Sequence, residues 1–240
     1  VKPLVLYSGE ILIIALVGSF CLSVGRYNIS FIDVLYCLVV QGDETQSNII
    51  FSFRLPRIIL AIVIGAGLSA AGVAFQSLFR NPLATPDILG VTSGVSFGAV
   101  LGLLLGLSIG YISFVGFIFG LASLALVVLI GYNKNMPYET TSMILSGIII
   151  GALFQSLIGI CKYVADPQDT LPSITYWLLG SLDTSLDTYV IWSLVGIMLG
   201  IGVIFILRWK LNLLMLQDDQ AISLGVNLPL LRVLSIFAST

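Results

Sequence analysis

The stretch that decides the fold is residues 57–97, RIILAIVIGAGLSAAGVAFQSLFRNPLATPDILGVTSGVSF. It carries no charge from Ile58 to Phe79, and a helix needs about 20 apolar residues to cross the hydrocarbon core of a bilayer. Small residues recur four apart, as at Gly67 and Ala71, a spacing that lets membrane helices approach closely. The stretch therefore predicts a membrane-spanning helix packed against other helices.

The rest of the chain has the same character. Its 240 residues are 58% hydrophobic and 9% charged, with a mean hydropathy of +1.10, whereas soluble domains carry about 25% charged residues. We expect an all-α, polytopic integral membrane bundle in one domain, 1–240. Six full spans are predicted, at 6–25, 57–78, 89–107, 112–131, 141–160 and 189–207. A seventh begins near Leu228 and is too short at Thr240 to cross, so we expect the chain to be the front part of a longer one.

The connections between these spans differ in kind. Residues 26–53 are predicted to form a long mixed loop with one short interfacial helix, and 161–188 hold another apolar segment too short to cross. Residues 208–227 read as a pair of short helices with a Gly225 C-cap. In the tight loop at 80–88, Thr85 is expected to cap the third span, with Pro86 in its first turn.

The basic residues give a weak prediction of topology by the positive-inside rule. With a cytoplasmic N-terminus, six fall inside and four outside. The inner set is Lys2, Arg80, Lys134, Arg208, Lys210 and Arg232; the outer set is Arg26, Arg54, Arg57 and Lys162. Arg54 and Arg57 thus work against the rule, and either anchor the chain at lipid headgroups or have a role on the outer face.

Several classes of function lack their usual residues. The chain has no histidine, its three cysteines show no C-x-x-C spacing, and it has neither a basic cluster for nucleic acid nor a phosphate loop for ATP. We therefore expect no metal site and no cofactor. An ion-coupled secondary transporter would need ionisable residues in mid-membrane, and a membrane enzyme a cluster of reactive groups; the sequence shows neither.

One polar residue stands out within the spans. Gly147, Gly151 and Gln155 follow one another at four-residue spacing on the fifth span, which puts them on one helix face. An amide on such a face should meet protein or water and not lipid. Gln155 either joins two helices or lines a translocation path.

The motifs around the second span resemble the permease subunits of ABC importers for ferric siderophores, haem and vitamin B12. These motifs are R-L-P-R at 54–57, G-A-G-L-S-x-x-G from Gly65, and Q-x-L-F-R-N-P-L-A-x-P-x-x-L-G from Gln76. ILSGIIIGALFQS, YWLLGSL and DDQAISLGVN follow in the family's order. The resemblance covers nearly the whole chain.

The resemblance implies a transport subunit and not an enzyme. Such permeases form homodimers in the bacterial inner membrane, with roughly ten spans per subunit arranged as inverted repeats. Two separate ATPase subunits use the ATP, and a soluble binding protein delivers the cargo. Ferric siderophore is the expected cargo, with haem, vitamin B12 and molybdate as alternatives.

The resemblance also implies roles for particular residues. Arg54 and Arg57 would dock the binding protein, presented from a stiff corner at Pro56. The cytoplasmic gate would comprise Asn81, Leu83, Thr140 and Thr141, although the threonines could equally cap a helix. The ATPase would contact the 217–226 segment through Asp218, Asp219, Ala221, Leu224 and Gly225. The two aspartates could favour the start of this helix or pair with a basic patch on the ATPase.

Overall fold

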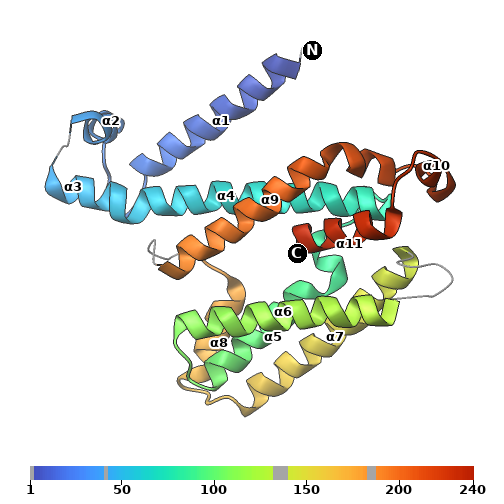
Figure 1. The fold of residues 1–240 in the computed structure, drawn as a ribbon. Coiled ribbons are helices and arrows are strands. Elements are labelled where there is room, and N and C mark those ends of the chain that lie inside the picture. Colours follow the sequence, from blue (N-terminus) through green and yellow to red (C-terminus); the bar gives the residue numbers. More distant parts are fainter. Residues whose placement is uncertain (1–2, 41–42, 132–139, 183–187) are drawn as a thin grey trace. The chain divides into compact units, whose positions relative to one another are not determined.

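The computed structural model describes residues 3–40, 43–131, 140–182 and 188–240, and every regular element within them is a helix (Figure 1). Contacts divide the chain into two compact units. The first comprises 1–65 and 182–194, and the second 66–181 and 195–240. The prediction of an all-helical chain is confirmed for these described residues, and their long apolar helices are consistent with a membrane bundle.

The long helices lie close to the predicted spans. They are α1 (Pro3–Ser23), α4 (Leu55–Phe79), α6 (Ile109–Gly131), α7 (Thr140–Val164) and α9 (Thr188–Leu214). Within the part of the chain that the structure describes, four stretches are long and apolar enough to cross a membrane: Glu44–Phe79, Ile109–Gly131, Thr141–Val164 and Val190–Leu214. Shorter apolar helices cover Tyr7–Ser23, Val91–Leu104 and Leu228–Ser239.

The predicted span 89–107 forms a shorter helix than expected. α5 (Val91–Leu104) has 14 residues, about 21 Å at 1.5 Å per residue, and the hydrocarbon core is about 30 Å thick. Gly90 (φ 66°) precedes the helix and Gly106 (φ 68°) follows it. These left-handed glycines end the α-helix at both sides, and a short 3-10 helix, η2 (Pro86–Leu89), comes before it.

The segment 26–53 of the first unit contains more helix than predicted. α2 (Phe31–Val40) is the one short helix that was expected, whereas α3 (Glu44–Asn48) and a π-helical turn η1 (Ile49–Arg54) replace much of the predicted loop. The turn continues without a break into α4. A small buried core holds the unit together: Leu22, Ile29, Val34, Cys37 and Ile50.

The second unit is built around α5, α6 and α7, which pack against one another. Phe97, Phe119 and Phe154 come from these three helices, with ring centroids 5.0 to 6.4 Å apart. α8 (Thr170–Leu179) packs on α5 and buries Ile174 completely. The apolar segment in 161–188 that was predicted to be too short to cross thus forms a 10-residue helix.

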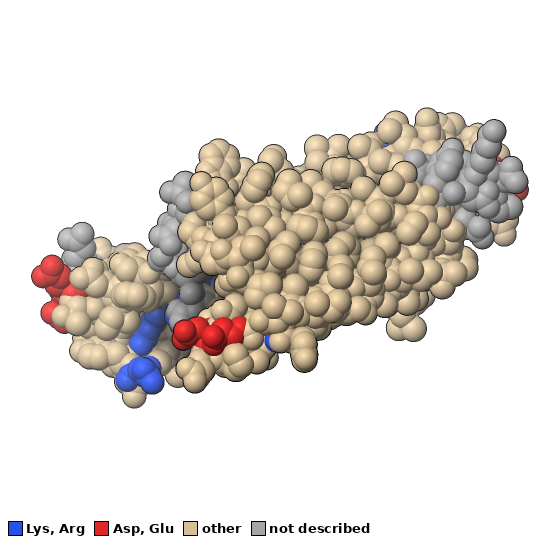
Figure 2. All heavy atoms as spheres, turned by 90° about the horizontal axis from the view of Figure 1, so that it is seen from below, with Lys and Arg blue, Asp and Glu red and all other residues tan. Residues whose placement is uncertain are grey.

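The 208–227 segment contains one separate short helix and not two. Residues 208–214 continue α9, since neither glycine nor proline interrupts it there. α10 (Asp218–Ser223) follows, and α11 (Leu228–Ser239) comes after a turn at Gly225. Figure 2 shows that most of the surface on one face is uncharged, with acidic and basic side chains in small groups.

Candidate functional site

The turn after α4 has an unusual backbone. Arg80 has φ 50°, the only positive value among the described non-glycine residues. The amide of Asn81 donates to the carbonyl of Gln76 at 3.2 Å, the bond that closes a helix when the residue after its end is left-handed. Glycine is the usual residue there, because a side chain adds strain.

Two predicted gate residues lie on this turn. The side-chain oxygen of Asn81 accepts a hydrogen bond from the amide of Leu83 at 2.9 Å, and the Leu83 side chain is 83% exposed. Thr141 is exposed in the first turn of α7, while Thr140 begins that helix and its side chain lies outside the described residues. Asn81 therefore shapes the turn that presents Leu83.

Thr85 was predicted to cap the third span, and this prediction is wrong. It precedes η2 and makes no side-chain cap bond, although Pro86 does occupy the first turn of η2. The Thr92 hydroxyl donates to the Asp87 carboxylate at 2.6 Å instead. The 3-10 helix shifts the start of α5 to Val91, away from Thr85.

Three charged residues from distant parts of the sequence meet beside this turn. Arg80 donates through Nε to the carbonyl of Leu214 at 2.8 Å and through Nη2 to Asp218. Arg232 donates through Nη2 to both carboxylate oxygens of Asp218 at 3.0 Å. We call Arg80, Asp218 and Arg232 the charged triad. It joins the end of α4, the end of α9, α10 and α11.

The charged triad stabilises the ionised form of Asp218. Partial burial acts to raise the pKa of this carboxyl, but hydrogen bonds from Arg80 and Arg232 and their positive charges outweigh it. The net effect holds the pKa of Asp218 below its ordinary value. Sequence analysis placed Asp218 in this region but missed Arg80 and Arg232, because no local pattern predicts a contact across 138 residues.

The predicted ATPase-contact residues have different environments on α10. Ala221 is fully buried in the core of the second unit, and Gly225 (φ 77°) forms the turn after the helix. Leu224 is 63% exposed and its neighbour Ile222 59% exposed. Asp219 is also exposed. The segment therefore presents apolar side chains outward from a helix that Ala221 anchors.

The glycine stripe on α7 packs against the turn before α5. A Cβ atom on Gly147 would overlap the carbonyl of Ile88 and lie 2.8 Å from the Cα of Leu89. A Cβ on Gly90 would lie 2.7 Å from the carbonyl oxygen of Gly147. Gln155, one turn beyond Gly151, is exposed and its Nε2 donates to the Ser93 hydroxyl of α5 at 3.4 Å. Gly147 thus serves helix packing, and Gln155 lies at the edge of the same contact.

The two arginines of the R-L-P-R motif lie in different environments. The Arg54 guanidinium donates to the carbonyl of Leu22 in the last turn of α1 and to that of Tyr27 after the helix, and a Cβ on Gly25 would lie 2.6 Å from its Nη2. Arg57 is exposed on the first turn of α4. Arg54 therefore has an internal contact, with three of its five N–H donors left for others.

The predicted stiff corner at Pro56 is wrong, since the chain is helical there. Leu55 has φ −61° and ψ −45°, which the residue before a proline usually avoids. Its amide donates five residues back, to Ile50. The wider π-helical turn gives room for the proline ring, which would otherwise clash with the preceding turn.

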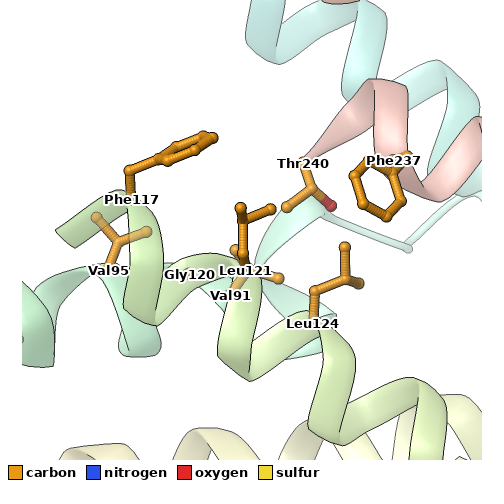
Figure 3. Close-up of a pocket in the computed structure, with 8 residues that line it drawn as sticks. All are labelled: Val91, Val95, Phe117, Gly120, Leu121, Leu124, Phe237 and Thr240. Carbon is orange, nitrogen blue, oxygen red and sulfur yellow. The ribbon is translucent and has the colours of Figure 1, made fainter. Parts of the chain in front are cut away.

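A pocket of about 140 Å³ lies elsewhere in the second unit, between α5, α6 and α11 (Figure 3). Its lining is almost wholly apolar: Val91, Val95, Phe117, Gly120, Leu121, Leu124, Phe237 and Thr240. It offers no charged group to a chelate. No cluster of three or more His, Cys, Asp or Glu side chains that could hold a metal ion occurs in the described parts of the chain.

The sequence matches the FecCD transport family over residues 11–240. The chain belongs to this family. A solved inward-facing structure of the metal-chelate type of ABC transporter superposes with a TM-score of 0.87 at 38% identity, covering 99% of this chain and 73% of the other.

Two curated relatives of this FecCD chain are named as permease proteins of transport systems. The molybdate import system permease protein MolB of Haemophilus influenzae is 37% identical over 99% of this chain and 71% of its own length. A probable iron chelatin transport system permease protein of Helicobacter pylori is 40% identical over 80% of this chain. The chain spans 57% of that relative's length. Nothing in these likenesses supports an ion-coupled secondary transporter.

Proposed function

We propose that this chain is the translocation subunit of a binding-protein-dependent ABC importer for a metal chelate. The observation that supports this most strongly is the match to the FecCD transport family over residues 11–240, together with the likeness to a metal-chelate type transporter. In this proposal two copies of the permease form a passage of roughly ten spans each in the inner membrane, with cytoplasmic N-termini.

The ATPase contact is proposed to lie on the 217–226 segment, within cytoplasmic coupling residues 208–227. In each permease copy, the exposed side chains of Ile222 and Leu224 would enter an apolar groove on one ATPase subunit. The two ATPase subunits use the ATP. Ala221 and Gly225 would set the shape of this element from within.

The binding protein is proposed to dock at the arginines of α4 and its preceding turn. Arg57 is exposed and suits a bidentate contact with a carboxylate. Arg54, held by the carbonyls of Leu22 and Tyr27, would fix this surface and offer its remaining donors. Such contacts would steer the approach of the partner more than they add affinity.

We place the cytoplasmic gate and the translocation path at the residues that the sequence motifs indicated. Leu83 and Asn81 would close the cytoplasmic end together with Thr140 and Thr141, and Gln155 would face the passage at the edge of the Gly147–Gly151 packing stripe. No metal ligand or cofactor is assigned to this chain, because the chelate would pass whole.

Ferric siderophore is our proposed cargo, with haem and vitamin B12 as relatives of the same chemical class. Molybdate is the second candidate, because MolB is similar over 99% of this chain. Calorimetric titration of the partner binding protein with a ferric siderophore and with molybdate would decide between them, since that protein selects the cargo.

Transport assays in proteoliposomes test the proposal as a whole. Proteoliposomes that contain the full-length permease and its ATPase, supplied with the binding protein, should accumulate the cargo. This uptake should require ATP in the compartment that faces the ATPase. Collapse of ion gradients with ionophores should leave uptake unchanged. Uptake that needs an ion gradient and no ATPase would overturn the proposal in favour of secondary transport.

A further inference from the structure

We propose that the charged triad transmits movement of α10 to the gate turn, with Asp218 as the positioning residue. This inference rests on the proposed function, in which α10 contacts the ATPase and residues 81–83 form a gate. In it, Asp218 acts inside the permease, and its carboxylate is not a contact for the ATPase.

The contacts of Asp218 place it at a junction of four elements. Its carboxylate accepts hydrogen bonds from Arg80, at the end of α4, and from Arg232 of α11. Arg80 also donates a hydrogen bond to the carbonyl of Leu214, the last residue of α9. The Arg232 side chain is only 10% exposed, against 46% for Asp218. A largely buried partner, Arg232, therefore holds Asp218 from one side, and Arg80 on the turn after α4 holds it from the other.

The backbone of Arg80 supports a role beyond ordinary helix capping. A left-handed residue at the end of a helix is most easily glycine, yet an arginine stands here at φ 50°. The side chain compensates for this strain through its contacts with Leu214 and Asp218. The triad thus fixes the conformation of the turn itself.

The gate turn follows Arg80 directly. Asn81 is the next residue, and its side chain holds the amide of Leu83. If α10 moves, Asp218 moves with it and pulls on the guanidinium of Arg80. Arg80 is itself part of the turn, so no further residue lies between α10 and the gate turn in this link. The ends of α4 and α10 should move together.

Asp219 offers a matched control. It lies next to Asp218 on α10 and is exposed, and no ion pair to it occurs among the described residues. Asp219→Asn removes the same charge from the same helix end, whereas Asp218→Asn also breaks the triad. Arg80→Gly is the complementary variant, because glycine keeps the left-handed turn while both side-chain contacts are lost.

The first experiment measures a distance and requires no cargo. Spin labels at exposed Thr85 and Gln220, in full-length permease with Cys21, Cys37 and Cys161 replaced, report the gate turn relative to α10. We expect a narrow distance distribution in the wild type and in Asp219→Asn, and a distribution at least twice as wide in Asp218→Asn and Arg80→Gly. An unchanged width in both triad variants would overturn the proposal.

The second experiment measures coupling in the assembled importer. Asp218→Asn should still co-purify with the ATPase and hydrolyse ATP, while cargo carried per ATP falls at least fivefold; Asp218→Glu should restore part of it. A merely structural role would lower assembly and hydrolysis together, and that result, or an unchanged ratio, would refute the inference. If the wild type itself shows no ATP-driven uptake, the proposed function fails, and the spin-label distances still test the mechanical link.

Discussion

At the scale of the residue, Arg54 shows how a charge near a membrane can serve the fold. Its guanidinium donates to the carbonyl of Leu22 in the last turn of α1, where helical partners are absent, and to that of Tyr27 just after the helix. The Leu22 side chain is buried. Gly25 lies beside the guanidinium and has no side chain to displace it. Arg54 and Arg57 should consequently respond differently to substitution.

We expect Arg54→Ala to lower the free energy of unfolding of the full-length permease by about 1–3 kcal/mol, because the part-buried carbonyl of Leu22 loses its donor. Arg57→Ala should weaken binding of the binding protein, because Arg57 is exposed on the first turn of α4. Thermal unfolding in detergent and binding isotherms measure the two effects. Wild-type stability of Arg54→Ala would contradict the capping role of Arg54.

At the scale of the element, the contact of α7 with the turn before α5 depends on missing side chains. Gly147→Ala should destabilise the permease by about 1–3 kcal/mol, since the new methyl group overlaps the backbone at Ile88 and Leu89. Gly159→Ala on the same helix is the control, because a Cβ atom added at Gly159 would meet nothing within 4 Å beyond its neighbours and the backbone of its own helix. Thermal unfolding should distinguish them; a stable Gly147→Ala protein would show that the turn can move away.

The pH dependence of α10 follows from the lowered pKa of Asp218. A carboxyl with a lowered folded-state pKa stabilises the fold above its unfolded pKa, about 3.9, and loses this contribution as the pH falls through the folded value. Arg80 and Arg232 stay charged throughout. The Thr85–Gln220 spin-label distance should stay narrow from pH 7 to about pH 5 and broaden only below about pH 4. Broadening near pH 6 would indicate that another group controls α10.

Sequence patterns predicted elements better than their ends and partners. Hydropathy located the helices because lipid requires long apolar runs, but it could not show that Gly90 and Gly106 shorten α5. The helix through Leu55 and Pro56 was missed, since a π-helical turn has no simple sequence signature. Ala221 and Asp218 were found as part of a motif, while their burial and ion pairs depend on residues far along the chain.

At the scale of the whole molecule, assembly with the ATPase should depend on the outward apolar side chains of α10. Leu224→Arg puts a charge into the proposed groove, and co-purification of the ATPase with full-length permease should fall at least tenfold. Gln220→Arg, which adds the same charge at an exposed polar position, should retain assembly. Normal assembly of Leu224→Arg would place the ATPase contact elsewhere.

The route of the cargo can be tested at Gln155. A cysteine there, with the three native cysteines replaced, should react with a water-soluble thiol reagent in at least one nucleotide state of the full importer. Gly147→Cys is a poor comparison because it would disturb packing, so Gly159→Cys on the same helix serves as the reference. Protection of residue 155 in every state would leave its bond to Ser93 as its only role.

The close approach of Gly90 and Gly147 has a consequence for how FecCD proteins diverge. The two backbones touch where neither residue has a side chain, and Gly90 also needs its left-handed φ of 66°. Neither glycine can be substituted without a change at the other contact, so aligned relatives should have glycine at both positions. Where a lineage has replaced residue 147, compensating changes should be concentrated in 86–90, and neutral variation should be found at Gly159 instead.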